Sequence, residues 1–495
     1  MSQTKRFKQG VSLFLVLTLA IGMFAGCGGS AQTPPSSSAA PGASPAAPQS
    51  NIADVQQQAQ SSGDFDWKQY EGTTVKVSFV QHTVADAIVS KLPEFTEKTG
   101  IKVEYSITPE ASYFDKLSTS LSSRSGDPDL FMSGAYQLWD YSTAGFVEDL
   151  DNFLQDASKI TSDYDFEDIV PSAVAALKWN GIPGYPVGEG AQLALPLAFE
   201  IYSLAYNTRA FAENNLEVPK TYDDLLKICD ALQEWNGPGS YAIALRGARD
   251  WGTIHPGYMS TYANFGAVDF EQKDNKLVSV VNSPEAVAMT EFWVELIKRG
   301  GSSSWSNYTW YEAGADLGAG KAAMMFDADN NGIHQNWDGA SQEAGNIAWT
   351  VMPVAKEGDT PNSNYWTWAM AMNSASKNKD AAWMFLMYFT SKEFAHYASV
   401  DMNSLDPART SVWDSDAFKS KMAKQPGYIE TYNATIDSTT ILFTPQPYFF
   451  ETTTEWAATL QDIVAGQYSS VEEGMNALKA KIDKAVSDID LSAYY

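Results

Sequence analysis

The chain has 495 residues, of which 44% are hydrophobic and 19% charged, a composition typical of a folded globular protein. Its length exceeds what one hydrophobic core usually holds, so two domains are expected. The net charge is −27, from 33 basic and 60 acidic residues, and this negative field argues against a nucleic-acid-binding protein.

The first residues have the pattern of a bacterial targeting segment. Lys5, Arg6 and Lys8 precede an apolar run at residues 11–24, which is short for a comfortable transmembrane helix. Residues 24–27, Phe-Ala-Gly-Cys, resemble the lipobox of bacterial lipoproteins, with Phe where Leu is usual. We therefore expect residues 1–27 to be a lipoprotein signal peptide with lipidation at Cys27. An ordinary secretory signal with an incidental cysteine is the alternative.

Residues 28–70 begin with a stretch dominated by Gly, Ser, Ala, Pro and Gln, without hydrophobic periodicity. This composition predicts a disordered tether that holds the folded part off the membrane. Beyond it the chain contains one cysteine, Cys229, so an internal disulfide is impossible there. Cys229 lies in a helical pattern of apolar residues and is expected to be a small buried hydrophobe.

From residue 74 onwards, strand and helix patterns alternate. Apolar residues predict strands at residues 75–80, 101–105 and 127–132. Helical patterns at residues 85–98 and 113–121 lie between them, although Pro93 should kink or restart the first helix. This rhythm predicts a parallel, doubly wound sheet, in which ligands bind beyond the carboxyl ends of the strands. Those ends carry Gln81 and His82 and, after the third strand, Tyr136.

An apolar run of strand length at residues 194–207 is interrupted by a single carboxylate, Glu200. Burial of a lone carboxylate is costly unless it gains partners, so Glu200 is expected to face a cleft. A structural Glu paired with a nearby Lys or Arg is the alternative. Further along, Thr221 followed by Asp223 and Asp224 predicts a helix start with Thr221 as the N-cap.

Several short motifs in a fixed order resemble those of the extracellular solute-binding proteins of ABC importers, in the sugar-binding branch. They are the strand with Leu195-Pro196 and Tyr206-Asn207, the helix start Pro-x-Thr-Tyr-Asp-Asp-Leu-Leu at residues 219–226, and Gly-Lys-Ala-Ala-Met at residues 320–324. The resemblance extends over residues 72–495.

The resemblance implies an α/β, two-lobed periplasmic-binding-protein-like fold. Each lobe would be a doubly wound sheet, and hinge crossings would join the two lobes. The expected boundaries place residues 71–198 plus 351–402 in lobe 1, and residues 199–350 plus 403–495 in lobe 2.

Carbohydrate ligands need planar hydrogen-bonding groups for their hydroxyls and aromatic rings for their C–H faces. The resemblance implies that both kinds of group line a cleft between the lobes. The substrate-binding candidates are Gln81, His82, Tyr136, Trp139, Glu200, Tyr202, Arg246, Trp251, Asp327, Asp329, Trp366, Trp368 and Arg409.

Many of these candidates have a structural alternative. Trp139 can pack in the core, and His82 can be a loop hydrogen-bonder. Trp366 and Trp368 are two residues apart and share a strand face, so both contact ligand or both fill core. Arg246 can simply pair with a nearby acid.

Residues 327–332 fit the calcium-loop pattern D-x-D-x-N-G, with Asp338 where Glu is usual. The segment follows an expected buried strand rather than a helix, and the resemblance places substrate contacts here. We therefore expect no metal site.

The sequence contains no HExxH, GxSxG, P-loop or CxxC motif, so a binding protein without catalysis or cofactor is expected. The predicted function is capture of a carbohydrate outside the cell, and an oligosaccharide is the favoured ligand. A monomeric protein, held at the cell membrane by its lipid, would deliver it to an ABC permease.

Two alternatives remain open. A lipoprotein glycoside hydrolase would use Glu200 with Asp327 or Asp329 as its carboxylate pair. A polyamine-binding protein would hold its cationic solute among acids and aromatic rings, and the presence of Arg246 and Arg409 counts against it.

Overall fold

The computed structural model describes residues 52–61 and 65–494. The predicted signal peptide, the predicted lipidation site at Cys27 and the first part of the predicted tether lie outside the described residues. Within the described ranges, no helix combines the length and the apolar composition that crossing a membrane requires.

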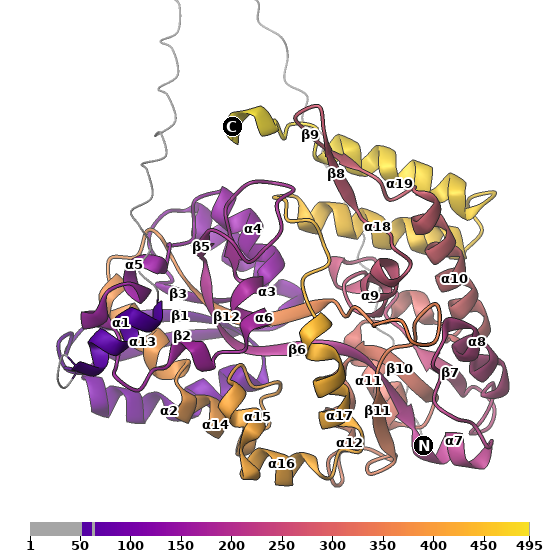
Figure 1. Cartoon of the computed structure of the whole chain (residues 1–495), viewed down its shortest axis with the longest axis horizontal. Helices are drawn as coiled ribbons and strands as arrows, with labels where there is room; N and C mark the ends of the chain where they lie inside the picture. Colours follow the sequence, from indigo (N-terminus) through magenta and orange to yellow (C-terminus); the bar gives the residue numbers. More distant parts are fainter. Residues whose placement is uncertain (1–51, 62–64, 495) are drawn as a thin grey trace, which may run out of the picture. The chain divides into compact units, whose positions relative to one another are not determined.

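The fold is organised around one mixed sheet of eight strands, in the order β2-β1-β3-β12-β6-β10-β7, with β11 also paired to β6 (Figure 1). Four of its strands, β3, β7, β10 and β12, are buried along their whole length. The strands are β1 (Thr74–Val80), β2 (Lys102–Thr108), β3 (Leu130–Gly134), β6 (Ala194–Asn207), β7 (Tyr241–Ala244), β10 (Ala322–Ala328), β11 (Ile347–Thr350) and β12 (Tyr365–Met372). Two small hairpins lie outside it: β4 (Lys178–Trp179) with β5 (Ala191–Gln192), and β8 (Phe270–Lys273) with β9 (Lys276–Ser279).

Strand β6 is the crossing strand that the sequence predicts. Its first part, as far as Ile201, pairs antiparallel with β12, whereas from Tyr202 onwards it pairs with β10 and β11. The first lobe therefore contains β1, β2, β3 and β12, and the second contains β7, β10 and β11. This exchange of partners lies close to the expected lobe boundary at residues 198 and 199, and the boundaries themselves stay a prediction.

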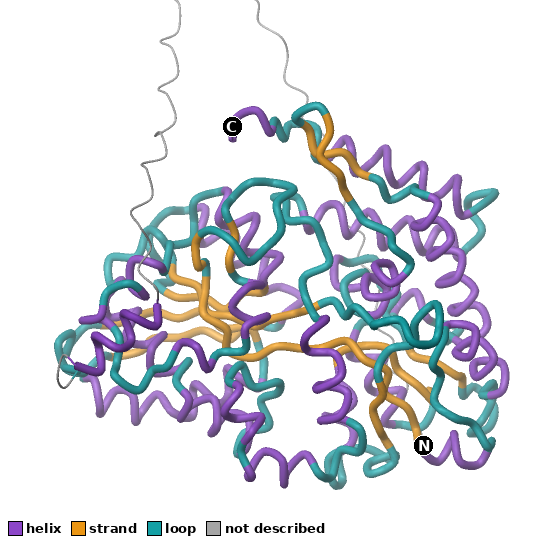
Figure 2. Tube along the Cα trace, viewed as in Figure 1, coloured by secondary structure: helices purple, strands orange, loops and turns teal. Residues whose placement is uncertain are grey.

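Helices flank the sheet on both sides (Figure 2). Those of the first lobe are α2 (Thr83–Thr99), α3 (Glu110–Ser122), α4 (Ala135–Thr143), α5 (Asp151–Leu154), α6 (Pro171–Ala176), α13 (Lys379–Phe389) and α14 (Lys392–Val400). Those of the second lobe are α7 (Thr208–Glu213), α8 (Tyr222–Ala231), α9 (Gly257–Asn264), α10 (Pro284–Gly300), α11 (Trp310–Gly318) and α12 (Asp329–Asn336). The C-terminal helices are α15 (Thr410–Asp414), α16 (Asp416–Met422), α17 (Tyr428–Thr435), α18 (Phe449–Val464) and α19 (Val471–Ala485).

The C-terminal helices contact both lobes, although the sequence analysis assigned residues 403–495 to lobe 2. Helices α15 and α16 pack against α14 of the first lobe, and α17 packs against β11 of the second. Helix α18 contacts α4 on one side and α10 on the other.

Local sequence signals correspond to several of these elements. Thr221 is the N-cap of α8, and its side chain and that of Asp224 form a reciprocal capping box. Cys229 is buried in that helix, as predicted. Helix α2 continues through Pro93 and ends at Gly100 (φ 71°), so the predicted restart is wrong. Burial of Leu92 and Phe95 against the first lobe offsets the hydrogen bond that the proline removes.

The predicted tether is wrong in its last part. Residues 52–61 form helix α1 (Ile52–Ser61), in which Val55 is buried. Gln56 donates from Nε2 to the backbone carbonyl oxygens of Thr161 and Ser162, each at 3.0 Å. The Gln-rich composition that suggested disorder therefore supplies the hydrogen bonds that hold this helix on the first lobe.

Candidate functional site

A cavity of about 490 Å³ lies where the two lobes meet, within the usual range for small-molecule sites. It is lined from the first lobe by the start of α2 and by β12, from the crossing strand by Glu200, and from the second lobe by α11 and α12. Among the sequence candidates, those that line it are Gln81, His82, Glu200, Arg246, Trp251, Trp366 and Trp368.

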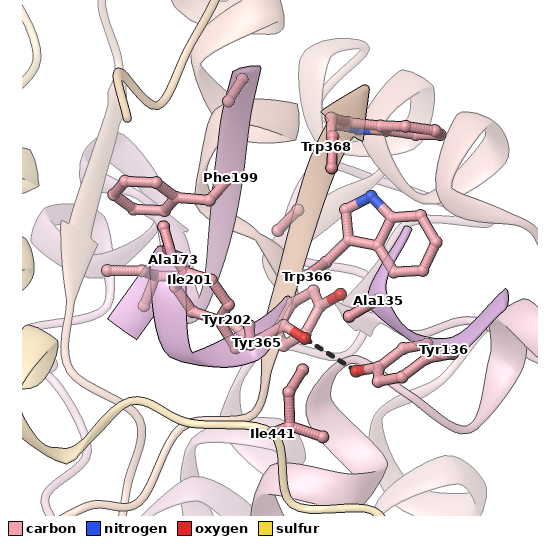
Figure 3. Close-up of a cluster of buried hydrophobic side chains, with 14 of the residues drawn as sticks. Ala135, Tyr136, Ala173, Phe199, Ile201, Tyr202, Tyr365, Trp366, Trp368 and Ile441 are labelled. Carbon is pink, nitrogen blue, oxygen red and sulfur yellow. Dashed lines mark hydrogen bonds between the residues drawn. The ribbon is translucent and has the colours of Figure 1, made fainter. Parts of the chain in front are cut away.

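Three tryptophans form an aromatic wall of this cavity. Trp366 and Trp368 project from the same side of β12 (Figure 3), so the predicted shared strand face is confirmed. Their ring centroids are 5.0 Å apart and their ring planes are nearly perpendicular. The ring centroid of Trp251 lies 5.5 Å from that of Trp366. The indole nitrogen of Trp366 is buried and has no hydrogen-bond partner within the described structure. The wall therefore offers flat apolar faces and one unused N–H donor.

Glu200 brings a carboxyl group to the same wall. The indole N–H of Trp368 donates to Oε1 of Glu200 at 3.1 Å, which joins β12 to the crossing strand. Burial raises the pKa of Glu200 to about 8, against the opposing effect of the Arg246 charge. No ion pair of Glu200 is present in the described ranges, so the alternative of a salt-bridged structural Glu is wrong.

Arg246 lines the cavity and is held rigidly by groups behind it. Its Nε and Nη2 donate to the two carboxylate oxygens of Asp327, at 2.8 and 2.6 Å, and Nη1 donates to the carbonyl oxygen of Gly252 at 3.1 Å. Nη1 also lies 3.1 Å from Nε2 of His255. Both ion-pair partners are buried. These contacts use four of the five guanidinium N–H groups, which leaves one N–H on Nη2.

His255 has a defined tautomer. Arginine can only donate, so Nε2 of His255 accepts from Arg246, and the ring proton is on Nδ1. That N–H donates to the hydroxyl oxygen of Tyr202 at 2.5 Å. Burial and the Arg246 charge lower the pKa of His255 well below its usual range, so the ring is neutral. Tyr202, a predicted contact, thus orients His255 and does not line the cavity.

His82 serves two purposes at the start of α2. Its Nδ1 accepts the backbone N–H of Val84 at 3.2 Å and caps the helix, and its ring packs 5.0 Å from that of Trp368. Burial lowers the pKa of His82 to about 3. The ring is therefore neutral, with its proton on Nε2. His82 is therefore a hydrogen-bonder, as one sequence interpretation has it, and it also lines the cavity, whereas its contact with ligand stays a prediction.

Tyr136 and Trp139 lie in the core behind the cavity. The hydroxyl of Tyr136 donates to the carbonyl oxygen of Tyr365 at 2.7 Å (Figure 3), and its ring stacks on Phe449 at 4.4 Å. Trp139 packs against both of these rings. Both side chains belong to the buried face of α4, so the structure places them as support for Trp366 rather than on the cavity surface.

The two predicted aspartates are also behind the surface. Asp327 is fully buried in its pair with Arg246. Asp329 is 3% exposed, and its Oδ1 accepts the backbone N–H groups of Asn330 and Ile201. Strand β10 passes directly into α12 here, so residues 327–332 form no open loop for calcium. Within the described ranges, no cluster of three or more His, Cys, Asp or Glu suits a metal ion.

Arg409 does not line the cavity, and its predicted place in a second-lobe loop is wrong. Its side chain is 1% exposed, and its Nε and Nη2 donate to the carbonyl oxygen of Thr390 at 3.0 and 2.7 Å. It also donates to the carbonyl oxygen of Asp165 and packs on the ring of Tyr164. All three partners belong to the first lobe, and the backbone at Arg409 also pairs with Ile169 of that lobe.

Several lining residues escaped the sequence analysis. They are Asp86, Glu110, His255, Trp310, Tyr311, Asn330, Asn331, His334 and Gln335. Trp310 and Tyr311, 42% and 66% exposed, lie at the rim. The indole N–H of Trp310 donates to Glu110 at 3.2 Å, which connects α11 of one lobe to α3 of the other. The adjacent Asn330 and Asn331 were visible in the sequence, but only as part of the calcium pattern.

Comparison with known proteins shows which family and which relatives this chain resembles. Residues 92–426 match the bacterial extracellular solute-binding proteins. The chain is 40% identical to the erythritol/L-threitol-binding protein of Mycolicibacterium smegmatis, over 82% of this chain and 84% of that protein. It is 26% identical to the mannitol-binding protein of Pseudomonas aeruginosa, over 59% and 63% of the two chains.

Solved structures show the same fold. A solute-binding protein of Agrobacterium radiobacter, in complex with ribitol, superposes with a TM-score of 0.72 at 20% identity, covering 84% of this chain and 99% of that chain. One from Agrobacterium vitis, with bound D-mannitol, gives 0.70 at 22% identity, with the same coverage. The predicted two-lobed binding-protein fold is therefore confirmed.

Proposed function

We propose a function that starts from an established fact: this chain belongs to the family of bacterial extracellular solute-binding proteins. The family and the related structures are binding proteins. We propose that this chain captures a small polyol in the cavity between its lobes and delivers it to an ABC permease, without catalysing a reaction on it.

The observation that carries this proposal is the pairing of aromatic and hydrogen-bonding surfaces in one cavity. Trp251, Trp366 and Trp368 supply apolar faces for C–H groups. Glu200 supplies carboxyl oxygens and Arg246 an N–H donor, each already fixed by a neighbour. Fixed polar groups around apolar walls suit a neutral, many-hydroxyl solute, because less order has to be imposed on binding.

A polyol fits better than the oligosaccharide that the sequence analysis favoured. The relative at 40% identity is named for two four-carbon polyols. A volume of about 490 Å³ is in the lower half of the range for small-molecule sites. In addition, the hydrogen bond between Trp310 and Glu110 crosses from lobe to lobe at the rim, which limits how far a long ligand can extend.

In this proposal closure of the lobes completes the site, since each lobe contributes part of the lining. A ligand that contacts both lobes favours the closed form through its greater affinity for that form. The permease would then select the closed, loaded protein. The domain boundaries predicted from sequence would follow the same division, with β6 as a crossing.

We further propose that Cys27 carries a lipid that holds the monomeric protein at the outer face of the cell membrane. The support is the lipobox-like sequence before Cys27. Stable anchoring of this kind requires more than one acyl chain. A Cys27→Ala variant should be released into the medium, and retention of this variant on the cells would contradict the anchor.

The first experiment is isothermal titration calorimetry of the full-length protein with erythritol, ribitol, mannitol, maltose and spermidine. Saturable binding of a polyol, recovered unchanged afterwards, supports the proposal. Loss of that binding in Glu200→Ala, but not in Asp338→Asn at an exposed position, assigns it to the cavity. Binding of maltose alone, or breakdown of any sugar, would overturn the polyol assignment or the absence of catalysis, respectively.

A cationic solute is the second candidate, because one observation favours it. Three carboxyl groups line the cavity, on Asp86, Glu110 and Glu200, whereas the charge of Arg246 is compensated by Asp327. Arg409, which counted against a polyamine, does not line the cavity. Binding of spermidine in the same panel, with no polyol response, would select this candidate.

A further inference from the structure

A pair of buried carboxyl groups lies behind the cavity at the crossing strand. Asp329 begins α12, and Asp406 belongs to the segment that follows α14; they are 3% and 0% exposed. Their carboxyl groups are within hydrogen-bonding reach of each other. No ion pair of either residue occurs within the described structure. Two like charges this close and this deep cannot both form at moderate cost.

The hydrogen bonds around the pair leave room for one shared proton. Tyr428 donates its hydroxyl to Oδ1 of Asp406, and Oδ1 of Asp329 accepts backbone N–H groups. Oδ2 of Asp406, however, is buried and has no donor within the described structure. A proton between the two carboxyl groups would supply it.

Both residues are attached to the crossing strand. The backbone of Asp406 exchanges two hydrogen bonds with Phe199, at 2.9 and 3.1 Å, and Asp329 accepts from the N–H of Ile201. The two points of attachment on β6, Phe199 and Ile201, thus lie on either side of Glu200 in the sequence. The contact between Asp329 and Asp406 ties the start of α12 to a segment that pairs along the same edge of that strand.

The first turn of α12 is one of the parts of the second lobe that line the cavity. Asn330 and Asn331 line the cavity, and Asn330 donates to the carbonyl oxygen of Leu405 at 3.1 Å, next to Asp406. Asn331 donates to the carbonyl oxygen of Trp310 at 2.8 Å, at the rim. A displacement of this turn would therefore move two lining amides and the rim together.

We propose that Asp329 and Asp406 are positioning residues for ligand binding: one proton shared between their carboxyl groups holds the first turn of α12 in its binding position. At alkaline pH the proton leaves, the two charges repel, and affinity for the ligand falls. The inference rests on the proposed function, because it concerns the same cavity, although neither carboxyl group lines the cavity surface.

The surroundings of the pair favour retention of this proton. Burial raises the pKa of Asp329 to about 7, and burial together with the Asp329 charge raises that of Asp406 well above its usual range. The other titratable groups that face the pair are Glu200 on β6, Tyr365 on β12, and Tyr428 and Tyr432 on α17. All of them are acids, so none offers a positive charge to either carboxylate. The two protons titrate as a property of the pair.

Trp349 provides a local reporter of this position. Its indole N–H donates to the backbone carbonyl oxygen of Asp329 at 3.0 Å, and its ring packs against Gly332 in α12. The indole N–H resonance of Trp349, assigned by its loss in Trp349→Phe, therefore senses the first turn of α12. It does so without ligand, so the test is independent of what the cavity binds.

The test is a pH titration of the ¹⁵N-indole-labelled full-length protein from about pH 6 to about pH 10, with erythritol affinity measured in parallel. In the wild type the Trp349 resonance should shift, and the affinity should fall about tenfold, at the alkaline end. Asp406→Asn keeps a hydrogen-bond donor and removes one charge. In this variant the resonance should stay constant and the alkaline loss should disappear, while Asp406→Ala should weaken binding at every pH.

The matched control is Asp338→Asn, which removes one exposed charge just beyond α12 and should behave as wild type. A Trp349 resonance that is constant in the wild type, or that shifts equally in Asp406→Asn, would overturn the proposal. If the resonance behaves as expected but erythritol fails to bind at any pH, the polyol assignment is wrong and the shared proton stands. If Asp406→Asn fails to fold, Asp329→Asn makes the same test from the other side of the pair.

Discussion

Arg246 and Asp327 form a buried bidentate ion pair, with Nε to Oδ2 at 2.8 Å and Nη2 to Oδ1 at 2.6 Å. Arg246 lines the cavity, whereas Asp327 lies behind it on β10. This pair separates two tasks that the sequence analysis had given to both residues. Asp327 fixes the guanidinium, and Arg246 presents its remaining N–H, on Nη2, to the ligand.

Substitution of Asp327 by Asn should affect stability and binding together. The change leaves the buried Arg246 charge without its partner, which typically costs about 3–5 kcal/mol of unfolding free energy. Ligand affinity should fall at least about tenfold, because the guanidinium loses its fixed orientation. Chemical denaturation and calorimetry measure the two effects. Asp338→Asn, which breaks an exposed pair with Lys424, should change stability by less than about 1 kcal/mol, and equal effects would contradict this interpretation.

Ligand binding should release protons through Glu200. The pKa of this group is raised to about 8 by burial, so in the free protein near pH 7 most molecules carry the proton. A ligand hydroxyl that donates to the carboxylate stabilises its ionised form and lowers that pKa, since hydrogen bonds to the charged form favour it. The sign is therefore net proton release on binding near pH 7.

Calorimetry in two buffers of different ionisation enthalpy measures this release directly. Glu200→Gln keeps the shape and stays neutral, so proton release should be lost while some affinity remains. Proton uptake by the wild type, or release that persists unchanged in Glu200→Gln, would contradict the role assigned to this carboxyl group.

Local patterns in the sequence were sufficient for the elements and for part of the site. The apolar run around Glu200 corresponds to β6, and the acids after Thr221 correspond to a capping box. The spacing of Trp366 and Trp368 placed both rings on one face. These features depend on residues close together in the chain, where period and capping rules apply directly.

The errors involve partners that are distant in sequence. Arg246 pairs with Asp327, 81 positions away, and Arg409 is enclosed by residues of the first lobe. Tyr136 follows a strand end as ligand-binding residues do, but the inward face of α4 directs it into the core. No local pattern distinguishes an aromatic or charged residue on the cavity surface from one in the layer behind it.

Gly134 should be essential for the position of Trp366. A methyl group at Gly134 would lie 2.2 Å from Cη2 of Trp366, so the ring must move. Gly134 has a φ of −104°, which any residue can adopt, so the effect of Gly134→Ala is purely steric. We expect ligand affinity to fall at least about tenfold. The double variant Gly134→Ala with Trp366→Phe removes the clashing ring, and a double-mutant cycle should show strong coupling; simple additivity would contradict the contact.

Trp366→Phe should weaken binding without weakening the fold. The indole N–H of Trp366 is buried and unpartnered in the described structure, so its removal loses no intramolecular hydrogen bond. It also relieves an unsatisfied donor, which costs about 1–3 kcal/mol. If this N–H binds the ligand, calorimetry should show affinity reduced about tenfold, while the melting temperature is unchanged or raised. Trp383→Phe is the matched control, because the indole of Trp383 donates to the carbonyl oxygen of Lys159 at 2.7 Å. It should lower the melting temperature and leave affinity intact, and the same pattern in Trp366→Phe would show that this donor is not part of the binding site.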